Sequence, residues 1–306
     1  MRYIDKYRMH ADARAINVRF LQDCYSSDIH CPIPSPANPD VSYADFKKAE
    51  YRDGENGWKN LLLEEQKSDG DLRCCYCMRK LNPQNGKINY EHIIPRSLSG
   101  NEGQTQYDYY SSHAPALRDH VMIASDFVRK SFVTTEDIDK EPRMPHTTAL
   151  SNLVVACNGK RETFSSTGCC CNNNRGDEKV MPIMLMPNAD TDVVYDANGI
   201  LTISCDDGTL KNITNELNDT TLQEIRSIWF HLSRVKKDLT NALRMPLIER
   251  INWFKTGYAT TNFATLPENV KRYLGALTAS DSDTYWELLL AYDWFYYYPG
   301  YAKQRN

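Results

Sequence analysis

The apolar residues at the start of the chain have mixed periodicity, and residues 1 to about 70 are predicted to be a helical segment broken by a loop. Four prolines between positions 32 and 39 mark a loop that cannot form regular structure. After this loop, the apolar residues of 58–63 face one side of a predicted helix, and charged residues face the other. We expect Gly70 to end this helix, because glycine readily takes the left-handed conformation found just beyond a helix.

The middle of the chain changes to strand-like patterns. The stretch 88–94 is rich in β-branched and aromatic residues with partial alternation, and 152–156 is short and apolar, so both are predicted strands. Between them, 124–132 has a helical pattern, and 134–145 is charged and predicted to be a loop. A further helix could begin at about residue 172.

The last third begins with a hairpin signal. Asn198-Gly199 separates apolar runs at 192–195 and 200–203, and both turn residues tolerate positive φ. Helical spacing returns at 222–243, and a last helix is predicted for about 282–298. These patterns predict an α+β protein in three parts: a helical N-terminal extension (1–70), a core (71–185) with an insertion at about 98–150, and a hairpin followed by a helical C-terminal region (186–306).

Composition and charge are those of a soluble globular protein. Hydrophobic residues make up 41% of the chain and charged residues 25%. The net charge of −4 argues against nucleic-acid binding by bulk charge, but leaves a local basic groove open. Since no apolar run could span a membrane and the first residues lack a signal-peptide core, we expect a cytoplasmic protein with no membrane partner.

Ten cysteines need an explanation in a reducing compartment, where metal ligation is favoured over disulfides. Cys74 and Cys77 have the spacing with which two thiolates grip one tetrahedral zinc ion. Cys157 is expected in the second pair with Cys171, which adjoins the Asn-rich stretch 172–174. Three other thiols, Cys75, Cys169 and Cys170, are alternative ligands or small buried side chains. The alternative is a group of inert core thiols or disulfides.

Between the cysteine clusters, an acid and a histidine, Glu91 and His92, end a predicted strand. Neighbouring side chains on a strand point to opposite faces, so the carboxylate can bind a hard cation such as Mg²⁺ while the imidazole activates water. Phosphodiester hydrolysis needs both a nucleophile and positive charge on the phosphate. An isolated pair of this kind is more often a solvated strand end, and its position between the clusters favours a catalytic role.

Asparagines near the cysteines complete the candidate site. Asn172 can share the cation with Glu91, or cap a helix. Asn152 is expected to bond backbone groups and hold the loop that carries His92, or to be an ordinary turn residue. Arg175 could contact phosphate. His146 is a secondary candidate because it lies near Asn152 in the sequence.

Together these motifs resemble the HNH endonuclease family, which has a ββα-metal fold, and within it the PtuB-type nucleases of Septu and retron-associated anti-phage systems. The resemblance covers about residues 60–185. It rests on the stretch from Glu65 to Met78 with its Cys-Cys-Tyr-Cys-Met end, Tyr-Glu-His-Ile-Ile-Pro-Arg-Ser at 90–97, Asn-Leu-Val-Val-Ala-Cys at 152–157, and Cys-Asn-Asn-Asn-Arg-Gly-Asp at 171–177.

The resemblance implies a zinc-stapled ββα-metal core with His92 as general base. Glu91 and Asn172 would hold the catalytic Mg²⁺ or Mn²⁺, and Asn152 would orient the site. Structural Zn²⁺ would be held by Cys74, Cys77, Cys157 and Cys171. Many relatives have histidine where this chain has Asn172, so metal binding would depend more on Glu91.

The implied function is metal-dependent hydrolysis of DNA, with RNA as the other substrate class. PtuB-type proteins work beside a PtuA-type ATPase, and this sequence has no phosphate-binding loop of its own. Aromatic residues at 286–298 suit either a docking surface for that partner or a helix core. The other hypothesis is a catalytically inactive, zinc-stabilised module that binds nucleic acid or protein. A redox role has no support, since no βαβ pattern surrounds the knuckle.

Overall fold

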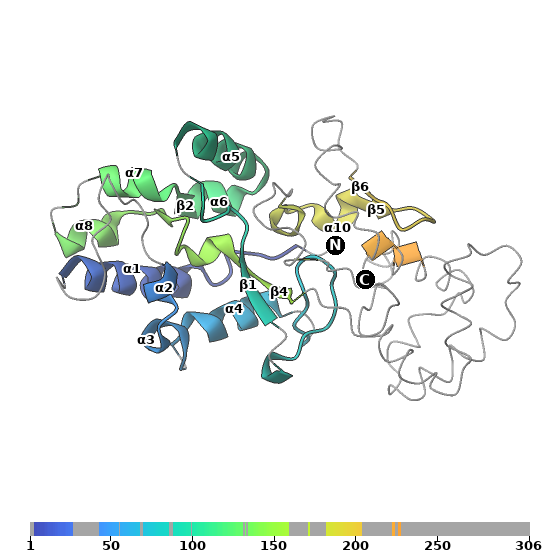
Figure 1. Cartoon of the computed structure of the whole chain (residues 1–306), viewed down its shortest axis with the longest axis horizontal. Helices are drawn as coiled ribbons and strands as arrows, with labels where there is room; N and C mark the ends of the chain where they lie inside the picture. Colours follow the sequence, from blue (N-terminus) through green and yellow to red (C-terminus); the bar gives the residue numbers. More distant parts are fainter. Residues whose placement is uncertain are drawn as a thin grey trace, which may run out of the picture.

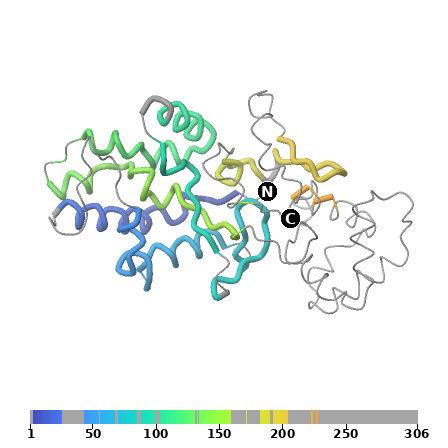
Figure 2. Tube along the Cα trace, viewed as in Figure 1, coloured from blue at the N-terminus to red at the C-terminus, as the bar shows by residue number. Residues whose placement is uncertain are grey.

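In a computed structural model of the chain, the structure describes residues 3–26, 43–54, 56–67, 70–85, 88–98, 100–130, 132, 134–158, 171, 182–203, 222–223 and 226–227 (Figures 1 and 2). These residues form a mixed α+β fold with small sheets. The elements in chain order are α1 (His10–Ser26), α2 (Tyr43–Phe46), α3 (Ala49–Arg52), α4 (Trp58–Gln66), η1 (Pro83–Asn85), β1 (Ile88–His92), α5 (Gly100–His113), α6 (Pro115–His120), β2 (Val121–Met122), α7 (Ala124–Arg129), α8 (Thr135–Lys140), β3 (Met144–Pro145), η2 (Leu150–Asn152), β4 (Leu153–Cys157), η3 (Ile183–Leu185), α10 (Ala189–Asp192), β5 (Val193–Tyr195) and β6 (Leu201–Ile203). None of the helices described is both long and apolar enough to cross a bilayer.

The antiparallel pair of β1 and β4 lies in the middle of the described fold (Figure 1). Its register pairs Ile88 with Cys157 at one end and His92 with Leu153 at the other. All of β4 is buried, whereas β1 is buried only at its last two residues. A two-stranded sheet is marginally stable by itself, so this pair depends on what packs around it.

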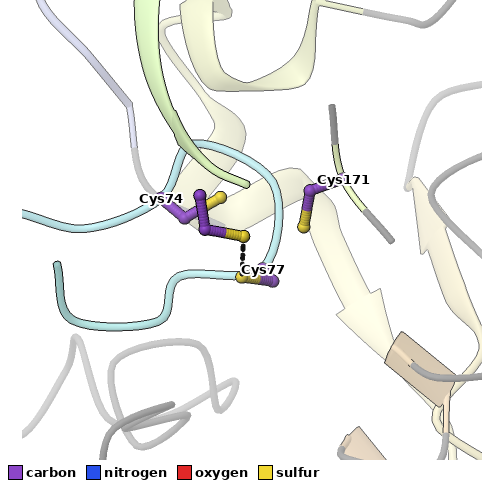
Figure 3. A group of neighbouring side chains, drawn as sticks. Cys74, Cys77 and Cys171 are labelled. Carbon is purple, nitrogen blue, oxygen red and sulfur yellow. Dashed lines mark hydrogen bonds between the residues drawn. The ribbon is translucent and has the colours of Figure 1, made fainter. Parts of the chain in front are cut away.

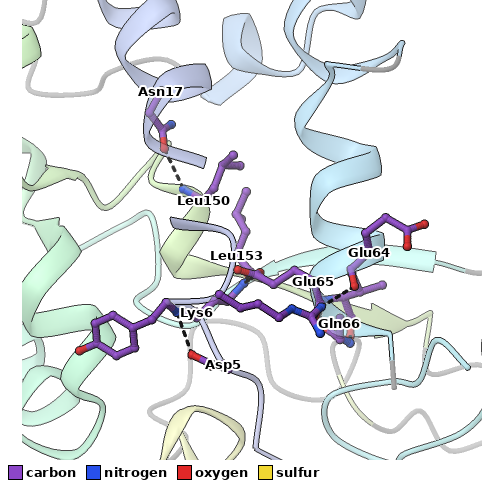
Figure 4. Close-up of polar contacts among 11 residues, drawn as sticks. Asp5, Lys6, Asn17, Glu64, Glu65, Gln66, Leu150 and Leu153 are labelled. Carbon is purple, nitrogen blue, oxygen red and sulfur yellow. Dashed lines mark hydrogen bonds and ion pairs between the residues drawn. The ribbon is translucent and has the colours of Figure 1, made fainter. Parts of the chain in front are cut away.

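Side chains from the N-terminal region form hydrogen bonds with the backbone groups on the outer edge of β4, where a third strand would otherwise pair (Figure 4). The amide of Gln66 bonds both the N–H and the carbonyl oxygen of Val155, each at 2.7 Å. The ammonium of Lys6 donates to the Leu153 carbonyl at 2.6 Å. A buried polar group left without a partner costs about 1–3 kcal/mol, so these bonds allow β4 to be buried on both edges.

Two further contacts anchor the N-terminal region. Lys6 is buried and forms an ion pair with Glu65 of α4. On α1, the buried Asn17 side chain donates to the Thr148 carbonyl at 2.8 Å and accepts from the Leu150 N–H at 3.1 Å. The N-terminal segment is therefore bonded directly to β4 and to the loop that precedes it.

The expected insertion folds over the same core. β2 pairs in parallel with β3, α6 packs on η2, and α8 packs on α1. The Tyr107 hydroxyl of α5 donates to the Val121 carbonyl at 2.6 Å, which fixes α5 to the start of β2. Buried apolar residues of the N-terminal helices, the β1–β4 pair and the insertion belong to one hydrophobic cluster.

The predicted hairpin is confirmed. β5 pairs with β6 in antiparallel fashion, and the turn between them is closed by bonds of 3.0 Å from Gly199 N–H to Asp196 O and from Asp196 N–H to Ile200 O. Gly199 has φ +76, and a side chain there would collide with the backbone of Gln223. Only glycine fits this position.

Other predictions need correction. The charge of the stretch 134–145 predicts a loop, but the stretch contains α8. Its start is fixed by a reciprocal capping box between Thr134 and Asp137. α4 ends at Gln66, and Gly70 lies in the following turn with φ 80 rather than at the helix end. α7 ends at Arg129, short of residue 132. The helices expected at 172 and beyond 227 lie outside the described residues.

Replacing Lys6 by alanine should lower the free energy of unfolding by about 3–5 kcal/mol, because the buried Glu65 carboxylate would lose its partner. Lys48→Ala is the control: its pair with Asp45 at 2.7 Å is on the surface and should contribute less than about 1 kcal/mol. Urea denaturation measures both, and equal losses would contradict the expectation.

Candidate metal centre and active site

Cys74 and Cys77 lie in a tight turn, the knuckle, formed by residues 72–81. The N–H of Cys74 donates to the Arg79 carbonyl, and the N–H of Met78 donates to the Cys74 carbonyl, both at 2.9 Å. Met78 has φ 60, a left-handed conformation that costs a non-glycine residue roughly 1–2 kcal/mol. The turn keeps both thiols within one small cluster.

The β1–β4 pair places a third cysteine next to the knuckle. Cys157 is the last residue of β4, and the N–H of Cys75 donates to the carbonyl of Val155 at 3.0 Å. This bond joins the knuckle to the same strand that carries Cys157. Cys171 completes the group from a separate stretch of chain, with φ 58.

The four sulfur atoms form a compact, buried cluster (Figure 3). All lie within 4.8 Å of one another, and the sulfurs of Cys77 and Cys157 are 3.8 Å apart. A tetrahedron with Zn–S bonds of about 2.3 Å has edges of about 3.8 Å. A disulfide needs about 2.05 Å. The spacing therefore fits a shared tetrahedral ion and not a disulfide.

The electrostatics of the cluster also favour a cation. Burial opposes ionisation, yet hydrogen bonds from Cys157, Cys171 and the knuckle thiols hold the pKa of Cys74 well below its ordinary value. Burial, with the neighbouring Cys74, raises the pKa of Cys77. The neighbouring thiols thus stabilise negative charge within the cluster. A divalent ion would allow all four to ionise together.

These are the four cysteines expected from the sequence, so a structural zinc site at this position is supported by both spacing and burial. Cys75 is buried beside them, but it is not one of the clustered thiols. Burial raises its pKa well above the ordinary value, which keeps it a neutral thiol. Cys169 and Cys170 lie outside the described residues.

Glu91 and His92 end β1, and each is only 8% exposed. As strand neighbours, their side chains leave the strand on opposite faces. The Nε2 atom of His92 lies 2.9 Å from the carbonyl oxygen of Thr147. Because a carbonyl can only accept, Nε2 carries the hydrogen and the neutral imidazole has its lone pair on Nδ1. The Thr147 carbonyl thus selects the tautomer.

Asn152 is fully buried and bonds only backbone groups. Its Oδ1 accepts from the Ile94 N–H at 2.8 Å, while Nδ2 donates to the carbonyls of Ile94 at 3.0 Å and His146 at 2.7 Å. The side chain therefore fastens the turn after His92 to the loop that carries Thr147.

An aromatic group from the N-terminal region covers one face of β1, and sequence analysis missed it. The ring of Tyr43 meets His92 edge-on with centroids 4.5 Å apart, and Trp58 meets Tyr90 in the same way at 5.0 Å. Tyr90 and His92 share a strand face because they are two residues apart. Phe46 stacks on Trp58 at 5.7 Å. The alternation in β1 indicates that this face is covered, but not which segment covers it.

His146 supports the site from the insertion. Its backbone N–H donates to Met122 O at 2.8 Å, and its Nδ1 accepts from the Ala124 N–H at 3.0 Å. Burial lowers the pKa of His146 to about 4, against a smaller opposing effect of the Arg96 backbone. His146 is therefore a neutral, buried residue that links β2 and α7 to the loop that carries Thr147, the partner of His92.

The rest of the expected catalytic metal site cannot be placed, because Asn172 and Arg175 lie outside the described residues. The structure brings Glu91, His92, Asn152 and His146 into one region around the end of β1. No protein-family model, no curated protein and no solved structure matches this chain. Any functional assignment therefore rests on the residues themselves.

Purified protein should contain one zinc ion per chain. Cys157→Ser should lose the ion and unfold the core, because structural thiolate sites contribute on the order of 10 kcal/mol in small zinc domains. Cys75→Ala, which removes a buried thiol outside the cluster, should keep the ion. Mass spectrometry of the bound metal tests this. A wild-type protein without zinc, or a Cys75→Ala protein that loses it, would overturn the assignment.

His146 should make the protein less stable in mild acid. Its pKa is about 4 in the folded protein against an ordinary value of 6.5, so the unfolded chain binds a proton first as the pH falls. The free energy of unfolding should therefore drop by about 2–3 kcal/mol between pH 7 and about pH 4.5 through this group. His146→Asn keeps an acceptor for the Ala124 N–H and should show a smaller drop in urea denaturation. Equal drops would show that another group is responsible.

Proposed function

We propose that this protein is a metal-dependent nuclease of the HNH type that hydrolyses phosphodiester bonds, with His92 as general base. The observation that carries the proposal is the 2.9 Å contact between His92 Nε2 and the Thr147 carbonyl. A histidine oriented in this way presents the Nδ1 lone pair as a proton acceptor.

Three groups hold that imidazole in place. The Thr147 carbonyl fixes its tautomer, Tyr43 packs against its ring, and Asn152 fastens the turn that follows it. A base held by a second group, which is itself anchored, is typical of hydrolytic sites. Its role is to take a proton from the attacking water.

Glu91 would hold the catalytic Mg²⁺ or Mn²⁺ together with Asn172. Its carboxylate is a hard oxygen donor of the kind that these ions prefer. When bound, the ion would stabilise charge on the phosphate and on the leaving oxygen. Among the described residues Glu91 is the expected ligand that can be placed, beside the proposed base on β1.

A catalytically inactive, zinc-stabilised binding module is the second candidate. The observation in its favour is the burial of both Glu91 and His92, each 8% exposed. A substrate phosphate needs access to both side chains. The alternative predicts that neither residue affects any phosphodiester cleavage.

The biological setting rests on the resemblance of the motifs alone. By that resemblance, the protein would be the nuclease subunit of a bacterial anti-phage system and would work with a PtuA-type ATPase on DNA, with RNA as the other option. The lack of a phosphate-binding loop in the sequence agrees with a separate ATPase partner. The C-terminal aromatic residues proposed for docking lie outside the described residues.

His92→Ala should lower the rate of nucleic-acid cleavage by about 10²–10⁴-fold or more, because it removes the general base. Plasmid, single-stranded DNA and tRNA are the substrates, with Mg²⁺ or Mn²⁺, with and without a co-purified ATPase. Zinc content should stay at the wild-type level, since His92 is not among the clustered ligands. Glu91→Gln should also be slow, but partly rescued by more divalent metal.

His113→Ala is the matched control. This histidine ends α5, where its Nδ1 contacts Tyr109 and Ser112, and its replacement should leave cleavage unchanged. Cleavage by His92→Ala at the wild-type rate would refute the proposed base. A wild-type protein that binds nucleic acid but never cleaves it, under any of these conditions, would favour the binding module.

A further inference from the structure

Tyr43 brings positive charge next to His92. Its ring meets the imidazole edge-on at 4.5 Å. The ammonium of Lys47 lies over the same ring, 5.1 Å from its centroid, and the guanidinium of Arg96 lies 5.0 Å from it. Two cations thus share one aromatic ring that touches the proposed base. We call Tyr43, Lys47 and Arg96 the cationic clamp.

The two cations come from different parts of the chain. Lys47 follows α2, directly after Phe46, and Arg96 follows the turn that Asn152 holds through Ile94. Both side chains belong to exposed residues, while the ring between them is buried. The placement of Arg96 relative to His92 is therefore set by the same bonds that fix the site.

Two nearby acids are engaged by other cations, while Glu91, whose charge also acts on Tyr43, is the proposed metal ligand. Asp45 pairs with Lys48 at 2.7 Å, and Asp53 pairs with Arg52 at 2.7 Å. Within the part of the chain that the structure describes, no ion pair includes Lys47 or Arg96. Burial raises the pKa of Tyr43 to about 12, so the ring stays neutral near pH 7 and adds no negative charge.

We propose that Lys47 and Arg96, held by the ring of Tyr43, bind the phosphodiester backbone of a nucleic-acid strand and position it beside His92. Lysine and arginine are the usual phosphate contacts, and arginine can bind phosphate oxygens with two parallel hydrogen bonds. The ring holds the two flexible side chains before the strand arrives, which reduces the entropy lost on binding. The identity of the ligand rests on the proposed nuclease function.

The clamp also explains how a chain of net charge −4 could attract nucleic acid. Bulk charge opposes such binding, so the positive groups must be local. Backbone contacts carry no base information, and the clamp should therefore bind different sequences about equally. An acidic protein segment is the competing ligand for the same charges.

The test compares Lys47→Ala/Arg96→Ala with a control of the same charge change, Arg129→Ala/Lys140→Ala, which removes exposed cations from α7 and α8. Binding of labelled single-stranded DNA, duplex DNA and RNA is measured by fluorescence anisotropy over a series of NaCl concentrations in full-length protein. The association constant K falls as the salt concentration rises, and each cation that binds a phosphate adds about 1 to the slope of log K against log [NaCl]. The clamp variant lacks two such cations, so the size of this slope should decrease by about 2 on duplex DNA. The control should match wild type.

Tyr43→Phe and Tyr43→Leu test the ring. Phenylalanine keeps an aromatic face and should preserve the affinity, whereas leucine removes it and should weaken binding without changing the number of charges. In cleavage assays the clamp variant should raise KM more than it lowers kcat. Melting temperatures and zinc content of all variants identify any that fail to fold.

The outcomes separate the two proposals. If wild type cleaves nucleic acid, but the clamp variant keeps the wild-type salt slope and KM, the clamp is refuted and the nuclease function stands. If the clamp variant shows the smaller slope but wild type never cleaves, the clamp stands and the catalytic function fails. Binding of a polyglutamate peptide, with no nucleic-acid binding, would assign the charges to an acidic protein and refute the clamp.

Discussion

The antiparallel pairing of β1 with β4 is the constraint on which the rest of the site depends. It joins residues that are more than sixty positions apart, and its register sets both functional ends at once. Ile88 opposite Cys157 places a thiol beside the knuckle. His92 opposite Leu153 places the imidazole beside the turn that Asn152 holds. A slip of one residue would turn every side chain of β1 to the other face.

Two strands cannot maintain that register alone. Lys6 and Gln66 bond the outer edge of β4, Asn17 bonds the loop before it, and an aromatic group covers one face of β1. Each of these contacts comes from the first 66 residues. The N-terminal region is thus part of the site's framework, although it supplies neither a cysteine of the cluster nor the acid–histidine pair.

Local chemistry could be predicted from the sequence, and distant contacts could not. The cysteine cluster is predictable because a tetrahedral ion limits which thiols can meet. The hairpin is predictable because Asn198-Gly199 marks a turn, although the turn starts at Asp196 and only Gly199 of this pair has positive φ. Nothing in the local pattern around Tyr43 shows that it touches His92, 49 positions later. The pair of Lys6 and Glu65, 59 residues apart, is equally hidden. α8 is not predicted from the sequence, because its capping box lies in a charged stretch that is expected to be a loop.

Different interactions hold the two ends of the β1–β4 pair. One end could hold a structural ion, and the other carries the proposed catalytic residues. Four thiols surround the Ile88–Cys157 end, whereas backbone hydrogen bonds and an aromatic ring hold the His92 end. Ile88 and His92 are four residues apart on an extended strand, which corresponds to about 13 Å. An ion at the cysteine cluster is therefore too far from His92 to polarise a phosphate bound there, and its four-thiolate shell leaves no open position for substrate. If the protein cleaves phosphodiesters as proposed, a catalytic ion would be a second one, with Glu91 as its proposed ligand. A zinc ion at the cluster would then act through the register of the strands that carry the proposed base.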